Sequence, residues 1–134
     1  MSGNTKASVL DGVHCRYAIS RPSGDRVLMV ISGSDIGEFG DAPMVMLEKQ
    51  MKGLERVELF IDARAVRGAS IEVSHDWAKW LSEHRSRFAH VNMLTGSRYI
   101  EMTAGFVRRF AGLQDVMRIY TSPAVFDSEL DGDD

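Results

Sequence analysis

The sequence predicts an α/β domain built on a mixed, mostly parallel sheet, with elements in the order β-β-α-β-α-β-α-β-α. Two observations support this prediction. Two β-type runs near the start of the chain are separated only by a short segment containing Pro and Gly, which is typical of an antiparallel hairpin. Further along, apolar runs alternate with segments of helical periodicity, and strands joined through helices are parallel. A length of 134 residues fits one such domain.

The hairpin follows an N-terminal segment, residues 1–12, that we expect to be flexible. In Val13–Ser20 apolar and polar residues alternate, which predicts a strand with one buried face. Arg21–Asp25 provides the turn. The almost wholly apolar Val27–Ser32 predicts a strand that is covered on both faces. The first strand should therefore be the antiparallel exception in the sheet.

The remaining elements follow from helix-capping residues, glycines and the spacing of apolar side chains. Their expected bounds are a helix from Asp41 to Gly53, a strand at Val57–Ala63, a helix at Ser70–Arg85, a strand at Ala89–Thr95, a helix at Arg98–Ala111, a strand at Val116–Tyr120 and a short helix from Ser122 to Leu130. The helix at Arg98–Ala111 is apolar over so wide a surface that we expect it to be deeply buried. The residues concerned are Tyr99, Ile100, Met102, Ala104, Phe106, Val107 and Phe110.

Composition argues against several classes of protein. Hydrophobic content of 44% and charged content of 26% are typical of a globular domain, and no apolar run approaches the roughly 20 residues of a membrane-spanning helix. The first residues are polar and predict no secretory leader, so we expect a cytoplasmic location. Cys15 is the single cysteine, which excludes an intrachain disulfide. The net charge of −3 argues against nucleic-acid binding, and residues 131–134 should form an acidic, solvated tail.

Taken with particular residues, the order of elements resembles the STAS domain family, and especially small bacterial STAS-like proteins related to the anti-sigma-factor antagonists. The topology is also similar to the lipid-binding lobe of Sec14-type proteins. The resemblance covers residues 13–130. The segments that carry it are Phe60–Ala63, Gly68, Ser74–Leu81, Asn92–Ser97 and Met117–Tyr120, followed by a helix with Phe126 and Leu130.

The resemblance implies a site at the start of the second helix. In the antagonists a serine in an Asp-Ser-Ser-Gly-like turn is phosphorylated by the partner kinase, and this switches binding. The matching turn here is Gly68–Ile71, with Ser70 near the position of that serine. Ala69 replaces the preceding acid, and the following Ser-Gly is absent. The serine of the phosphorylation switch is therefore matched here, but the residues on either side of it are not.

Physical chemistry gives Ser70 two roles. Its hydroxyl is suited to cap the helix N-terminus, which stabilises a helix by about 1 kcal/mol. A phosphate at the same place would meet free N–H groups and a favourable dipole. It would add negative charge near Arg64 and Arg67. Asp62, at the tip of the preceding strand, is expected to pair with one of these arginines or to accept hydrogen bonds from the loop.

Histidines and tryptophans offer further candidates. His75 and His84 are nine residues apart and face different sides of a helix, and no His-x-His or His-x-x-x-His spacing exists, so we expect no metal site. His84 is expected at the core boundary, and His75 in contact with solvent or a partner. Trp77 and Trp80 predict packing against the sheet, with the alternative that Trp80 lines an apolar pocket.

These observations favour a non-catalytic, intracellular protein-interaction or regulatory module, without a cofactor. Its partner would be another protein, such as a kinase or regulator, or a second copy in a homodimer. The alternative is a small apolar, lipid-like ligand in a buried pocket near Trp80 and His84. No catalytic constellation is present in the sequence, so we do not expect an enzyme. The expected interaction face is the loop at residues 64–70 with the start of the next helix, and its candidate residues are Asp62, Arg64, Arg67, Ser70, Ser74 and His75.

Overall fold

The computed structural model describes residues 7–132, which form a six-stranded sheet with helices on both of its faces. The elements are β1 (Ser8–Asp11), β2 (Cys15–Ser23), β3 (Arg26–Asp35), α1 (Ala42–Met51), β4 (Val57–Ala69), α2 (Ile71–Glu83), a 3₁₀ turn at Arg85–Arg87, β5 (Phe88–Thr95), α3 (Arg98–Phe110), β6 (Met117–Tyr120) and α4 (Pro123–Asp131). None of the helices in this part of the chain is both long and apolar enough to cross a membrane.

The sheet has its strands in chain order, β1 to β6. β1 and β2 pair antiparallel, as do β2 and β3. The pairs β3–β4, β4–β5 and β5–β6 are all parallel. The predicted mixed sheet, with an antiparallel hairpin followed by parallel strands, is therefore confirmed.

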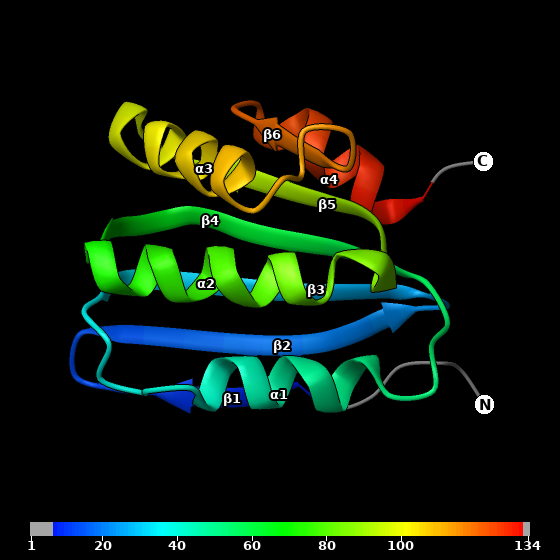
Figure 1. Cartoon of the computed structure of the whole chain (residues 1–134), viewed down its shortest axis with the longest axis horizontal. Helices are drawn as coiled ribbons and strands as arrows, with labels where there is room; N and C mark the ends of the chain where they lie inside the picture. The colour runs from blue at the N-terminus through cyan, green and yellow to red at the C-terminus, as the bar shows by residue number, and fades with distance from the viewer. Residues whose placement is uncertain (1–6, 133–134) are drawn as a thin grey trace.

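The helices form unequal layers (Figure 1). α1, α2 and α3 pack on one face of the sheet and α4 on the other. Side chains alternate along β4, so that Leu59 and Ile61 join the larger core while Phe60 joins the smaller one. In the smaller core the ring of Phe126 packs edge-on against Phe60 and Tyr120, with centroids 5.7 Å from each.

Serine hydroxyls cap three of the four α-helices within residues 7–132. Ser70, Ser97 and Ser122 each accept a hydrogen bond from the backbone N–H three residues later, at 3.1, 3.2 and 3.3 Å respectively. These bonds satisfy N–H groups that have no partner within the helix. Asp41 occupies the cap position of α1, as expected, but its side chain makes no capping hydrogen bond.

The N-terminal segment differs from the prediction. Residues 8–11 lie within the stretch that we expected to be flexible, yet they form β1 and pair with β2. Leu10 packs against the larger core, which gives even this short strand an apolar anchor. Residues 1–6 and the last two of the acidic tail lie outside the described residues, and Asp131 is the last residue of α4.

β4 is longer than predicted. The strand expected to end at Ala63 continues to Ala69, so the expected loop at residues 64–70 is mostly strand. Its second half pairs with Ser32–Asp35 of β3 after two shifts of register, and Val66 is buried there against the larger core. The sequence did not predict this part of the strand because only one of its faces is apolar. Its arginines and glycine are typical of a loop.

The prediction that α3 would be deeply buried is wrong. Its core-facing stripe is narrow and consists of Ile100, Ala104 and Val107. Tyr99, Met102 and Phe110 are exposed. A helix that packs on a sheet buries one stripe, and among the described residues nothing covers the second apolar side of α3.

Candidate functional site

The start of α2 is fixed by Ser70, as expected. Its hydroxyl caps the helix, its backbone N–H donates to the carbonyl of Asp35 at 3.0 Å, and its own carbonyl accepts from both the N–H and the hydroxyl of Ser74. Ser70 is half-buried and Ser74 is buried. The Ser74 hydroxyl is therefore engaged within the first turn of α2.

Asp62 and Arg64 belong to another part of the molecule. Arg64 Nε donates to both carboxylate oxygens of Asp62 at 3.0 and 3.1 Å, and Nη2 donates to Asp127 of α4 at 2.8 Å. The hydrogen bonds to Asp62 and Asp127 raise the pKa of the Arg64 guanidinium above its usual value. This trio joins β4 to α4, while Arg67 is exposed farther along β4. The six predicted interface residues therefore do not form one site.

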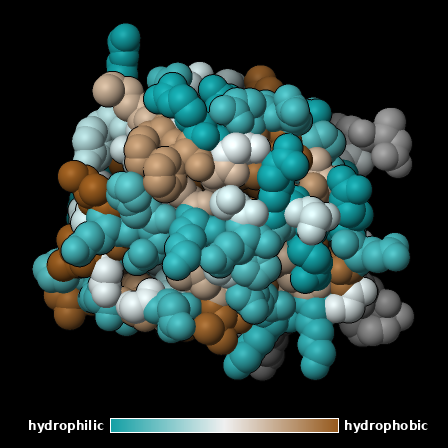
Figure 2. All heavy atoms as spheres, in the orientation of Figure 1, coloured by the Kyte–Doolittle hydropathy of each residue, from teal (hydrophilic) through white to brown (hydrophobic). Residues whose placement is uncertain are grey.

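An exposed apolar surface lies where α2 and α3 meet. His75 packs edge-on against Phe106 and Phe110, with ring centroids 5.4 and 5.0 Å apart, and the two phenylalanines stack on one another. A surface groove beside them is lined mainly by apolar side chains, including Ile71 and Met102, which are 78% and 71% exposed. Tan side chains gather over α3 and along its border with α2 (Figure 2). We call this surface the α2–α3 face; it consists of Ile71, His75, Tyr99, Met102, Phe106 and Phe110.

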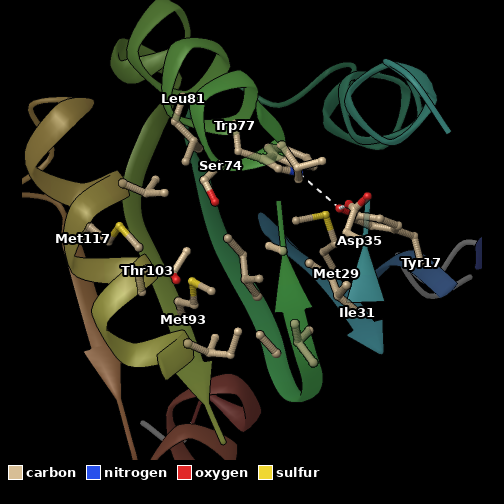
Figure 3. A pocket seen from close by; sticks show the side chains of 18 residues that line it. Tyr17, Met29, Ile31, Asp35, Ser74, Trp77, Leu81, Met93, Thr103 and Met117 are labelled. Atoms are coloured by element: carbon tan, nitrogen blue, oxygen red, sulfur yellow. Dashed lines mark hydrogen bonds between the residues drawn. The ribbon is translucent and has the colours of Figure 1, made fainter. Parts of the chain in front are cut away.

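An apolar cavity of about 80 Å³ lies beneath the same two helices, against the sheet. Met29 and Trp77 line one side of it, and Met93, Thr103 and Met117 the other (Figure 3). Its volume is well below the roughly 300–1,000 Å³ that is usual for ligand pockets. The cavity as it stands holds at most a very small molecule.

One end of the cavity carries a buried polar trio. Tyr17 donates its phenol hydrogen to Asp35, and Trp77 Nε1 donates to the phenol oxygen at 3.1 Å. The other oxygen of Asp35 accepts from the N–H of Gly37 at 3.0 Å. Burial, followed by the charge of Asp35, raises the pKa of Tyr17 above its ordinary value, so the phenol stays protonated. Asp35 is thus only 6% exposed, beside the apolar walls of the cavity. Tyr17 and the Gly37 N–H donate to its carboxylate, and Trp77 donates to the Tyr17 oxygen.

The sequence did not identify this trio. Tyr17 lies within the alternating run Val13–Ser20, and Asp35 lies outside every element that the sequence predicted. The one available signal was an acid next to a strand end, the same signal that selected Asp62. Sequence alone gave no reason to pair residues 18 positions apart across a hairpin.

Trp80 and His84 lie away from the cavity, contrary to the expected pocket. Trp80 is buried between α1 and α2, and its Nε1 donates to Glu48 of α1 at 2.9 Å. His84 stacks on the Trp80 ring with centroids 4.2 Å apart, and its Nδ1 lies 2.8 Å from the Trp80 carbonyl oxygen. These residues join α1 to α2, and Trp77 takes the place in the cavity that the sequence had suggested for Trp80.

A further polar cluster lies on the sheet face opposite α2. His90 Nδ1 is 2.6 Å from Glu58 Oε2, and His90 Nε2 is 3.3 Å from Arg118 Nη2. Asn92 donates to Glu58 at 3.4 Å and accepts from the Tyr120 hydroxyl at 3.1 Å. The side chains satisfy one another across β4, β5 and β6. Across residues 7–132 no three His, Cys, Asp or Glu side chains are grouped so that they could hold a metal ion.

Comparison with known proteins identifies the fold. An uncharacterized protein of the DUF3478 family from Shewanella loihica, with a SpoIIAA-like fold, superposes on this chain with a TM-score of 0.64 and 16% sequence identity. The match covers 92% of this chain and 99% of that one. No protein-family model and no curated protein matches the sequence. The chain therefore has the SpoIIAA-like fold, and the resemblance to STAS domains is confirmed at the level of the fold.

The Ser70 cap predicts a specific effect on stability. Ser70→Ala should lower the free energy of unfolding by about 1 kcal/mol, whereas Ser70→Asp should retain most of it because aspartate accepts the same N–H and suits the helix dipole. Urea unfolding measures both. Ser82→Ala, on the exposed side of the same helix, is the matched control and should change little. An equal loss at both positions would show that the Ser70 hydroxyl has no capping role.

The buried phenol and thiol predict a loss of stability at alkaline pH. Burial and the Asp35 charge raise the pKa of Cys15 from 9.0 to about 12, and they raise that of Tyr17 as well. The unfolded chain loses these protons first, so the folded state binds more protons and its stability must fall as pH rises beyond about 9. Tyr17→Phe should lose about 1–3 kcal/mol near neutral pH because Asp35 loses a donor.

The same variant should show a shallower fall in unfolding free energy from about pH 9 to pH 11, because one of the two groups has been removed. Urea titrations at several pH values give this slope. Parallel slopes in wild type and Tyr17→Phe would mean that the phenol ionises as readily in the folded protein as in the unfolded chain.

Proposed function

We propose that this protein is a non-catalytic, intracellular interaction module of the STAS type, which binds a protein partner through the α2–α3 face. The observation that supports the proposal is the exposure of large apolar side chains side by side on two packed helices. Isolated apolar residues are ordinary on a surface, whereas a contiguous apolar patch marks a site that is covered by something else.

The character of the α2–α3 face suits a protein partner. Tyr99, Phe106 and Phe110 are aromatic, and Met102 is a flexible apolar side chain; such residues are enriched in the centres of interfaces. Both helices are anchored to the sheet by their opposite sides, so little order has to be gained on binding. The face differs in part from the one expected from the sequence, which combined residues 64–70 with the start of the next helix. Ile71 and His75 belong to that helix start, whereas the contribution of α3 was not expected.

A switch at Ser70 is not needed for this proposal. The Ser70 hydroxyl is half-buried and already engaged with Val73, and Arg64 is committed to Asp62 and Asp127. Among the predicted site residues, His75 is the one that belongs to the α2–α3 face. Recognition by apolar burial therefore requires no change in the charge of the module.

Site-specific photo-crosslinking in cells tests the proposal. A photoreactive aromatic residue in place of Met102 should cross-link to a protein, because that position lies in the α2–α3 face. The same residue in place of Val125, which is 52% exposed on α4, is the control and should give no specific product. Equal cross-linking at both positions, or none at position 102, would overturn the proposal.

The cavity supports a second candidate function, the binding of a small apolar ligand. Its walls are almost wholly apolar, and buried apolar cavities take up molecules such as benzene. If a ligand binds there, benzene should raise the melting temperature of the wild-type protein in proportion to the logarithm of its concentration. Ala104→Leu, which fills the cavity from α3, should abolish that rise. A melting temperature that benzene leaves unchanged would exclude this function for the cavity as described.

A further inference from the structure

The α2–α3 face is flanked by charges of opposite sign. On the solvent side of α2, Glu72, Asp76 and Glu83 recur at helical spacing and are all exposed. On the solvent side of α3, Arg98 and Arg109 are exposed, and the acid Glu101 is exposed between them, one turn from Arg98. The apolar groove thus lies between an acidic ridge on one helix and a basic ridge on the other.

The two ridges match in length and position. α2 and α3 each have 13 residues, and because both follow parallel strands they run in the same direction (Figure 1). Glu72 and Glu83 are eleven residues apart, as are Arg98 and Arg109, which corresponds to about 16 Å along each helix. Glu72 and Glu83 are the second and the last residues of α2, and Arg98 and Arg109 are the first and the second-last residues of α3. The two pairs therefore lie at almost the same heights along their helices.

From this match we infer that the partner of the α2–α3 face is a second copy of this chain, in a two-fold dimer whose axis runs along the groove. The inference rests on the proposed function, since it names the occupant of the same face. That axis places α2 over the partner copy's α3, with the helices parallel. Glu72 then lies near Arg98 of the other copy and Glu83 near its Arg109, and the symmetry makes each contact twice.

The charges select this arrangement over the other two-fold packing. An axis perpendicular to the helices would place α2 on α2, with acidic residues against acidic residues, and α3 on α3, with arginines against arginines. Lys79 is the exposed basic residue within the acidic ridge, and in the chosen packing it lies opposite the stretch around Gly105, between the two arginines. Glu101, exposed beside Arg98, is an acid that this packing places near the acidic ridge of the other copy. The four glutamate–arginine contacts at the ends of the helices outweigh it.

The apolar residues supply the affinity and the ridges supply the orientation. Exposed ion pairs contribute little to affinity, although like charges brought together across an interface are costly. Ile71, Tyr99, Met102 and Phe110 would be covered by the same residues of the other copy. The dimer would thus remove from water the side chains that the single chain leaves exposed.

Charge exchange between two variants tests the inference. One variant carries Glu72→Lys and Glu83→Lys, and the other carries Arg98→Glu and Arg109→Glu. Sedimentation velocity on the whole chain should show a dimer for the wild type. Each variant alone should dimerise about tenfold or more weakly, because its ridges then carry like charge. Circular dichroism checks that both remain folded.

Mixing the two variants should restore the dimer, because the lysine ridge of the first meets the glutamate ridge of the second and their two unaltered ridges also match. A single chain with all four changes should dimerise like wild type. Met102→Lys, which leaves both ridges intact, should prevent dimerisation in every combination because it places a charge in the apolar centre.

The outcomes separate this inference from the proposed function. A wild-type chain that stays monomeric while position 102 cross-links to a different protein overturns the dimer and leaves the interaction module standing. A wild-type dimer that both charge variants preserve also overturns it, because the contact then lies on another face. Monomeric protein without any specific cross-link overturns both.

Discussion

The parallel pairing of β3 with β4 over almost the full length of both strands determines where everything else lies. Because β4 continues to Ala69, α2 begins at Ile71, directly after its cap Ser70, whose backbone N–H is bonded to the carbonyl of Asp35 at the end of β3. The same strand end places the Asp35 carboxylate beside Tyr17, whose hydroxyl oxygen accepts from Trp77. If the paired strands ended earlier, as the sequence suggested, the helix start, the polar trio and the cavity would each have to move.

α2 and α3 serve two surfaces at once. Towards the sheet, Ala104 and Val107 help to line the cavity, while on the other side Phe106 and Phe110 form part of the α2–α3 face. Substitutions one residue apart can therefore have different consequences: a change at Val107 disturbs packing over the sheet, and a change at Phe106 alters what the surface attracts. His75 links the two helices through its contacts with both phenylalanines and gives the exposed surface a defined shape.

The sequence predicted what depends on local chemistry and missed what depends on distant partners. The cap at Ser70, the hairpin and the positions of most strands along the chain were recoverable because capping, alternation and turn residues act within a few positions. The second half of β4 was missed because Arg64 and Arg67 made a paired strand resemble a loop. The exposure of Met102 could not be predicted, because apolar spacing does not show which of the two apolar stripes of α3 meets the sheet. The pairing of Tyr17 with Asp35 could not be predicted either, because the two residues are 18 positions apart.

The order of strands in the sheet, which repeats their order along the chain, has a consequence for how the chain acquires its structure. Every strand from β2 onward pairs with the one immediately before it, so each new strand finds its template already synthesised. The loops to be closed span only one helix or one turn, and short closures are the least costly in entropy. The sheet can therefore grow during translation, one edge at a time, without waiting for the C-terminal half to emerge.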